Sequence, residues 1–356
     1  MLEGIKRILV IKLKHIGDVL LTTPTIHALR EGFPESQIFA LVPKGTEGVL
    51  TGNPDLDGVL TFSRNNDLGF LERLREEVSL LRKIRRYGFD LVLEMGKGDR
   101  EAILGFLSGA RFRVGYDPKG SGFLGRNHLL THTVALDHGK HIVEANLDLC
   151  RAIGLEPKNK DLRLAVLPED TGFVESLLKD EGVLSSDLLV TIHPVSKWLF
   201  KCWRDEGFAE VADYLIEKYK AQVAITSGPL EREIKKARKV IELMKAKPID
   251  LRGRLNIKEL AALISRSRLF LGVDSAPMHI AAAVKSPIIV LFGPSGEHNW
   301  GPWGEGHIVI KKDMDCRPCG KDGCNGTKRS ECLELITTDE VIAAVDEQLS
   351  KTKALC

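Results

Sequence analysis

The stretch RILVIKLKHIGDVLLTTP, residues 7–24, shows the pattern that the rest of the chain repeats. The apolar-rich residues from Arg7 to Lys12 predict a buried strand, and a short basic loop follows them. Gly17 and Asp18 then stand where a helix should begin. The stretch therefore predicts a strand, a loop and a helix, with a carboxylate at the turn where α/β proteins bind ligands.

Short β-branched runs alternate with helical patterns in both halves of the chain. This rhythm predicts parallel sheets that are covered by helices on both faces. One helix is expected from Asp18 to Glu31, and another over about residues 68–87. The other predicted strands include residues 36–43, 58–63, 89–96, 111–116, 188–194, 221–228, 248–253, 268–274 and 287–293.

Residues 154–170, GLEPKNKDLRLAVLPED, predict a linker between two domains because they are polar and have no sustained period. The expected boundary separates residues 1–165 from residues 166–336, and each part is an α/β unit. Ligands of such sheets bind outside the carboxyl ends of the strands. The expected site is therefore a cleft between two facing Rossmann-like domains.

The composition describes an ordinary globular protein and excludes several functions. The chain has 356 residues and a net charge of +2, which gives no support for a nucleic-acid partner. No apolar run reaches the roughly 20 residues that a membrane span needs. Charged side chains interrupt any signal-peptide core in the first twenty residues, so the expected location is cytoplasmic.

The stretch GVDSAPMHIAAAVKSPIIVLFGPS, residues 272–295, is a candidate phosphate site. Asp274 and Ser275 close a predicted strand, and a helix of small residues follows. Free backbone N–H groups at this helix start suit a phosphate, and Ala276 allows close approach. The alternative is that Asp274 or Ser275 only caps the helix.

Another strand end, HPVSKWLFKCWRDEGF at residues 193–208, carries Lys197 and Lys201. A lysine here can neutralise the charge on a leaving pyrophosphate, or it belongs to a basic loop with no such role. Glu231 at the next strand end either accepts hydrogen bonds from ribose hydroxyls or only favours a helix start. With Asp18 as a general base on the other domain, these residues indicate group transfer from a nucleotide-diphosphate donor.

Three blocks of the chain resemble glycosyltransferase family 9, the ADP-heptose:lipopolysaccharide heptosyltransferases. They are VIKLKHIGDVLLTTPTIHALR (residues 10–30), IHPVSKWLFKCW (residues 192–203) and residues 272–295. SKWLFKCW and the tail CRPCGKDGCNGTKRSECL look most like the heptosyltransferase III branch. The resemblance implies a GT-B fold, with an acceptor-binding first domain, an ADP-sugar-binding second domain, and a C-terminal helix over residues 337–356 that packs back on the first domain.

The resemblance also implies the reaction: inverting transfer of L-glycero-D-manno-heptose from ADP-heptose to a heptose hydroxyl of the lipid-linked lipopolysaccharide inner core. By position, Asp18 matches the catalytic base and Lys201 matches the lysine on the donor phosphates. Asp274 matches an aspartate near the donor sugar. The other matched positions are Ser196, Ser275 and Ala276 beside the phosphates, and Glu231 on the adenosine. Lys12 and His15 are placed on the acceptor side, where His15 departs from the family pattern by replacing a small polar residue near the base.

No metal is expected to be required, because cationic side chains and a helix start can hold the diphosphate. Cys316, Cys319, Cys324 and Cys332 have the spacing C-x2-C-x4-C-x7-C, which fits either a zinc site or four reduced thiols. The thiols are favoured because the expected catalysis has no role for the metal. The basic run at residues 81–87 is either a solvated face, which is favoured, or a surface that attracts the phosphates of a lipid-linked acceptor or the inner membrane.

Two alternatives remain for the function. One is a transferase of the same fold that uses another nucleotide sugar, and the other is a non-catalytic nucleotide-sugar-binding protein. A dehydrogenase is disfavoured, because no G-x-G-x-x-G follows the first strand.

Overall fold

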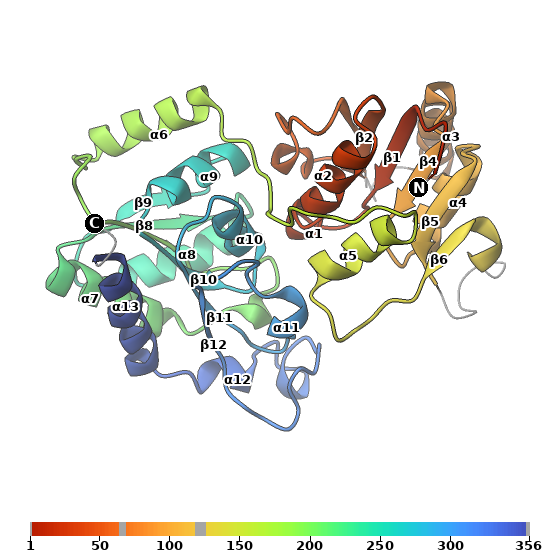
Figure 1. The fold of residues 1–356 in the computed structure, drawn as a ribbon. Coiled ribbons are helices and arrows are strands. Elements are labelled where there is room, and N and C mark those ends of the chain that lie inside the picture. Colours follow the sequence, from red (N-terminus) through yellow and green to blue (C-terminus); the bar gives the residue numbers. More distant parts are fainter. Residues whose placement is uncertain (1, 64–68, 118–125, 354–356) are drawn as a thin grey trace. The chain divides into compact units, whose positions relative to one another are not determined.

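The computed structural model describes residues 2–63, 69–117 and 126–353. The contacts between residues divide the chain into two compact units, unit 1 (Met1–Ala165) and unit 2 (Val166–Cys356). This division falls at the boundary expected from the polar linker. Each unit contains a parallel sheet with helices packed on it (Figure 1). In the part of the chain that the structure describes, no helix is both long enough and apolar enough to cross a membrane.

Within its described residues, unit 1 forms a sheet of parallel strands in the order β3-β2-β1-β4-β5-β6. The two central strands, β1 and β4, are buried almost throughout, which explains their apolar sequences. The strands are β1 (Arg7–Ile11), β2 (Gln37–Pro43), β3 (Gly58–Phe62), β4 (Leu91–Glu94), β5 (Phe112–Tyr116) and β6 (His132–Val134). The helices are α1 (Ile16–Leu20), α2 (Thr23–Gly32), η1 (Glu47–Val49), α3 (Phe70–Tyr87), α4 (Asp99–Leu107), η2 (Arg126–Leu129) and α5 (Ile142–Arg151).

The single helix predicted from Asp18 to Glu31 is wrong, because the structure has two helices there, α1 and α2. The hydroxyls of Thr22 and Thr23 donate to the carbonyls of the preceding turn, at 2.7 and 2.8 Å. Pro24 then lies in the first turn of α2, where its missing N–H costs no hydrogen bond. The break makes α1 a short helix that holds Asp18 beside the end of β1.

Unit 2 has a sheet with the equivalent order, β12-β11-β10-β7-β8-β9, and its core is built around Trp203 and Phe208. The strands are β7 (Leu189–His193), β8 (Gln222–Ser227), β9 (Ile249–Arg252), β10 (Leu269–Val273), β11 (Ile288–Leu291) and β12 (Ile308–Ile310). The helices are α6 (Pro168–Asp180), η3 (Leu199–Lys201), α7 (Asp205–Tyr219), α8 (Glu231–Leu243), α9 (Ile257–Arg266), α10 (Ala276–Ala283), α11 (Glu297–Trp300), η4 (Cys324–Gly326), α12 (Glu331–Glu334) and α13 (Thr338–Lys353).

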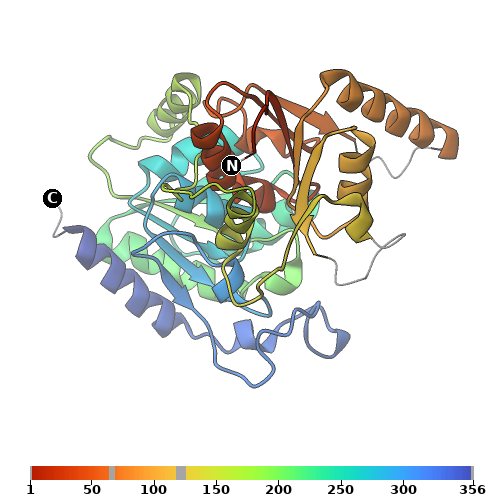
Figure 2. The same ribbon diagram turned by 45° about the vertical axis from the view of Figure 1, so that its right-hand side comes forward.

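The C-terminal helix α13 packs on unit 2, which corrects the expectation that it packs back on the first domain. Figure 2 shows α13, in dark blue, beside α7 of unit 2. The residues Val341, Val345 and Leu349 of α13 belong to the core of that unit. The Trp203 indole donates to the carbonyl of Ile336 at 3.0 Å and ties down the segment that leads into the helix. The amphipathic pattern indicates that one face is buried but does not indicate against which domain.

The strand orders place a topological switch point at the middle of each sheet. In unit 1 it lies between β1 and β4, and in unit 2 between β7 and β10. The connections from these neighbouring strands run in opposite directions, which leaves a crevice at their carboxyl ends. The residues that follow these four strands are therefore the first candidates for ligand binding.

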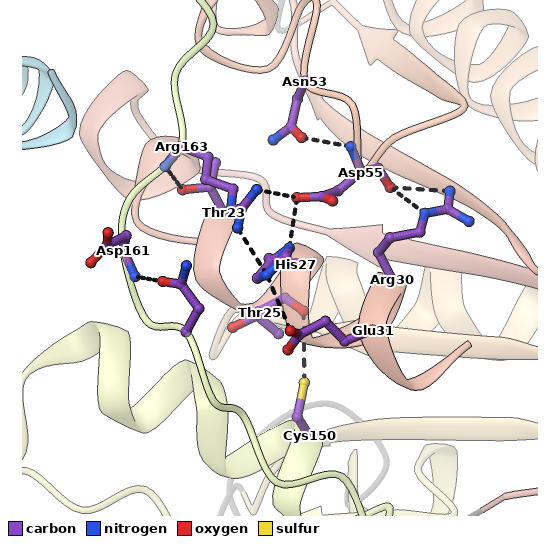
Figure 3. Close-up of polar contacts among 11 residues, drawn as sticks. Thr23, Thr25, His27, Arg30, Glu31, Asn53, Asp55, Cys150, Asp161 and Arg163 are labelled. Atoms are coloured by element: carbon purple, nitrogen blue, oxygen red, sulfur yellow. Dashed lines mark hydrogen bonds and ion pairs between the residues drawn. The ribbon is translucent and has the colours of Figure 1, made fainter. Parts of the chain in front are cut away.

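The end of the linker is held against unit 1 by a polar network around His27 (Figure 3). The Arg163 guanidinium donates to Nε2 of His27 at 2.9 Å, and Nδ1 of His27 lies 3.1 Å from a carboxylate oxygen of Asp55. A guanidinium can only donate, so Nε2 accepts from Arg163 and Nδ1–H donates to Asp55. The backbone N–H of Arg163 also donates to Thr23 Oγ1 at 3.0 Å.

The Arg163→Ala variant is expected to lose about 1–2 kcal/mol of stability in urea unfolding, because it removes hydrogen bonds to partly buried groups. Arg254→Ala is the matched control. Arg254 is about half exposed and lies 3.5 Å from Glu181, and such surface pairs contribute about 0–1 kcal/mol. Equal losses in the two variants would contradict the assignment of Arg163 as the attachment of the linker.

Candidate active site

The end of β1 brings together Lys12 and Asp18. Lys12 is 4% exposed, and its ammonium donates to the carbonyl of Met95, just past β4, at 2.8 Å. The same ammonium lies 3.5 Å from Oδ1 of Asp18, in the first turn of α1. Burial lowers the pKa of Lys12, and the carboxylates of Asp18 and Glu101 oppose that shift. The switch point of unit 1 therefore holds a carboxylate fixed by a buried cation.

His15 lies at the exposed N-cap of α1, and its side chain makes no capping hydrogen bond there. It is thus on the solvent side of the loop, whereas Lys12 is on the buried side. The two residues expected to contact the acceptor have different environments. Lys12 contacts the candidate base directly, and its buried ammonium is engaged with protein atoms.

The switch point of unit 2 holds a second lysine–aspartate pair. The Lys201 ammonium, in η3 after β7, donates to Oδ2 of Asp274, directly after β10, at 2.6 Å. Asp274 is 7% exposed, and the Lys201 side chain is 22% exposed. Two residues 73 positions apart meet here because β7 and β10 are neighbours. In this pair the Lys201 ammonium is accessible to solvent, whereas the Asp274 carboxylate is buried.

The loop that carries Lys201 is shaped by Ser196 and Cys202. Ser196 is buried, its N–H donates to the Cys202 sulfur at 3.2 Å, and its hydroxyl accepts from the N–H of Trp198 at 3.3 Å. Burial raises the pKa of the Cys202 thiol to about 11, so the thiol stays neutral. Ser196 therefore closes the turn that positions Lys201.

Ser275 and Ala276 form the start of α10. Ser275 is the extended N-cap, and its hydroxyl donates to the carbonyl of Val273 at 3.2 Å, so it makes no side-chain cap to the helix. Pro277 lies in the first turn. The first N–H groups of a helix have no partner within the helix, so this helix start suits an anion beside Asp274 and Lys201.

Glu231 begins α8 and is exposed, whereas Glu233, in the first turn of the same helix, is buried with its carboxylate beside Gly228, just after β8. A Cβ added at Gly228 would collide with the Glu233 carboxylate. Burial raises the pKa of Glu233, and Arg232 and Lys197 lower it. Glu233 is therefore a second acidic candidate at this strand end, next to the one predicted from the sequence.

The described cysteines form no disulfide. Burial raises the pKa of the Cys332 thiol, and the nearby Cys324 and Cys319 thiols raise it further. Among the residues that the structure describes, no group of three or more His, Cys, Asp or Glu side chains is arranged to hold a metal ion. The preference for reduced thiols over a zinc site stays a prediction.

The comparisons with known proteins give the family. The profile described as "Glycosyltransferase family 9 (heptosyltransferase)" matches residues 78–329. The chain belongs to glycosyltransferase family 9. One family 9 relative, "Lipopolysaccharide heptosyltransferase 3" of Escherichia coli (strain K12), is 31% identical over 340 residues, which are 95% of this chain and 96% of the relative. The predicted family and enzyme class are therefore confirmed.

Solved structures agree with the fold. The glycosyl transferase family 9 protein from Veillonella parvula DSM 2008 has a TM-score of 0.83 and 27% identity, and the match covers 97% of both chains. An E. coli heptosyltransferase solved with ADP has a TM-score of 0.75 and 15% identity, over 96% of this chain and 99% of that one. The predicted GT-B fold with two Rossmann-like units is confirmed.

Among the buried carboxylates that sequence reasoning missed in this family 9 chain, Glu101 and Glu233 lie beside strand ends of the candidate site. Glu101 lies in the first turn of α4, the helix after β4, and Glu233 lies in the first turn of α8, the helix after β8. In each case a glycine that follows the strand lies beside the carboxylate. The glycines of GKG and SGP were a usable signal, because a glycine at a strand end allows another group to approach closely.

Proposed function

We propose that the chain is an inverting glycosyltransferase that moves L-glycero-D-manno-heptose from ADP-heptose to a heptose hydroxyl of the lipopolysaccharide inner core. The observation that carries the proposal is the 31% identity over 95% of the chain to a lipopolysaccharide heptosyltransferase 3. The geometry supports it, because each switch point holds a carboxylate paired with a lysine.

In the proposed reaction, Asp18 accepts the proton of the attacking hydroxyl as its oxygen bonds to the anomeric carbon of the donor. The bond from that carbon to the phosphate oxygen breaks, and ADP leaves with the electron pair. Positive charge develops on the sugar ring, as in glycoside hydrolysis. Inversion follows because the acceptor and the leaving group occupy opposite faces of the anomeric carbon.

Lys201 and the start of α10 are proposed to hold the diphosphate of the donor. Lys201 supplies the cation and the backbone N–H groups of Ser275 and Ala276 supply neutral donors. Glu231 or its buried neighbour Glu233 is proposed to accept hydrogen bonds from the nucleoside. Lys12 and His15 are assigned to the acceptor side, where Lys12 acts by holding Asp18.

Incubation with ADP-heptose and defined truncated core acceptors tests the function, with product mass and anomeric linkage as the readout. A product one heptose heavier and inverted at the anomeric carbon is expected. Turnover of UDP- or GDP-sugars in place of ADP-heptose would favour another nucleotide-sugar transferase. ADP-heptose binding without any product would favour a binding protein. The lipid-linked acceptor, the cytoplasmic location and the peripheral contact with the inner membrane belong to the same proposal.

Transfer is expected to need no metal, because Lys201 and the α10 start supply the positive partners of the diphosphate. Dialysis against EDTA should leave the initial rate unchanged. The control is the same dialysis without chelator. A loss that added zinc restores would instead assign a metal to the protein, with Cys316, Cys319, Cys324 and Cys332 as its first candidate ligands.

A further inference from the structure

The Lys12 ammonium is a buried cation that faces charges from several elements. Asp18 of α1 and Glu101 of α4 raise its pKa, Lys14 of the same loop lowers it, and burial lowers it most. A buried ammonium needs paired charge or hydrogen bonds to remain protonated. Its direct contacts are the Met95 carbonyl at 2.8 Å and Asp18 at 3.5 Å.

Glu101 is a carboxylate that the proposed reaction does not use. It lies in the first turn of α4, directly after the strand that pairs with β1, and is 3% exposed. A Cβ at Gly96 or Gly98 would collide with its carboxylate oxygens. The glycines of the loop after β4 thus leave room for this carboxylate at the switch point that Lys12 and Asp18 occupy.

We propose that Glu101 is a positioning residue for the catalytic base: it keeps Lys12 in place as the cation that holds the Asp18 carboxylate aimed at the acceptor hydroxyl. The inference rests on the proposed function. Lys12 engages Oδ1 of Asp18, which leaves Oδ2 to receive the proton. Glu101 itself exchanges no proton and forms no bond in the reaction.

The need for a second carboxylate follows from the reaction. When Asp18 takes up the proton of the acceptor, it loses its negative charge, and Lys12 loses its direct ionic partner. A buried ammonium without compensation is costly. Glu101 supplies that compensation throughout the step, so the transition state does not require Lys12 to move or to lose its proton.

The test is the pH dependence of kcat in Glu101→Gln with ADP-heptose and core acceptor. The variant should lower kcat about 10-fold through loss of alignment, with KM for the donor little changed. Loss of a negative charge destabilises the Lys12 ammonium, so Lys12 deprotonates at lower pH. The alkaline limb of the plot of kcat against pH should therefore move to lower pH by about one unit.

Asp99→Asn is the matched control, because Asp99 is in the same first turn of α4, whereas Glu101 is the α4 carboxylate that raises the pKa of Lys12. Gly98→Ala is a second probe, since the added Cβ displaces the Glu101 carboxylate without removing its charge. Gly98→Ala should also lower kcat. Glu101→Asp should recover part of the kcat that Glu101→Gln loses.

The proposal is overturned if folded Glu101→Gln keeps the wild-type kcat and alkaline limb, or if Asp99→Asn shifts that limb equally. Thermal melting identifies a variant that fails to fold. If Glu101→Gln fails to fold, kcat and its alkaline limb are measured in Gly98→Ala and Glu101→Asp instead. Failure of the proposed function is distinct, because the wild-type protein itself would then transfer no heptose.

Discussion

Asp18→Asn is expected to transfer heptose about 1,000-fold more slowly than the wild-type protein, which is within the range of a lost general base. The amide retains the shape of the carboxylate but cannot accept the proton of the acceptor hydroxyl. Asp18 lies in unit 1, whereas Lys201 and Asp274 lie in unit 2. The affinity for ADP should therefore stay within about twofold, a difference far smaller than the tenfold that 1.4 kcal/mol represents.

The measurement combines initial rates with ADP-heptose and calorimetric titration with ADP. Asp18→Glu is the informative companion, because it keeps the charge but moves the carboxylate by one methylene away from its contact with Lys12. It should retain more activity than Asp18→Asn at saturating donor. Normal turnover by Asp18→Asn would remove Asp18 from the role of base, and a parallel loss of ADP binding would indicate a structural role instead.

The parallel sheets were predictable, because buried parallel strands read as near-continuous apolar runs. β7 and β10 are buried at every position, and their sequences show it. The break between α1 and α2 was not predictable from periodicity, because it depends on the hydroxyls of Thr22 and Thr23 bonding back to the preceding turn. The packing partner of α13 was also hidden, since an amphipathic pattern is the same against either domain.

The candidate site was predictable in part for a related reason. Asp18, Lys201 and Asp274 stand at strand ends, and strand ends can be located along the sequence. The pairing of Lys12 with the loop after β4, 83 positions away, depends on which strands are neighbours. The burial of Glu101 depends on that pairing as well, so its role becomes visible only in three dimensions.

Lys201→Met is expected to lower kcat and weaken ADP binding, each by about 100-fold, the loss typical of a group that stabilises charge developing on a leaving group. The substitution removes the cation and leaves Asp274 as a buried carboxylate without it. That carboxylate then repels the diphosphate. Lys201→Arg keeps the charge and should lose much less. Lys197→Met is the matched control in the same loop, because the Lys197 ammonium lies over the Trp198 ring, 5.5 Å from its centre.

The double variant Lys201→Met/Asp274→Asn separates a catalytic from a structural role of the pair. Breaking a buried pair by removing one partner destabilises a protein strongly, whereas replacing both partners is often near neutral. The double variant should therefore regain the melting temperature that Lys201→Met loses. Because it still lacks a cation at the diphosphate, its kcat should remain low. Recovery of both stability and kcat in the double variant would show that Lys201 acts only as the partner of Asp274.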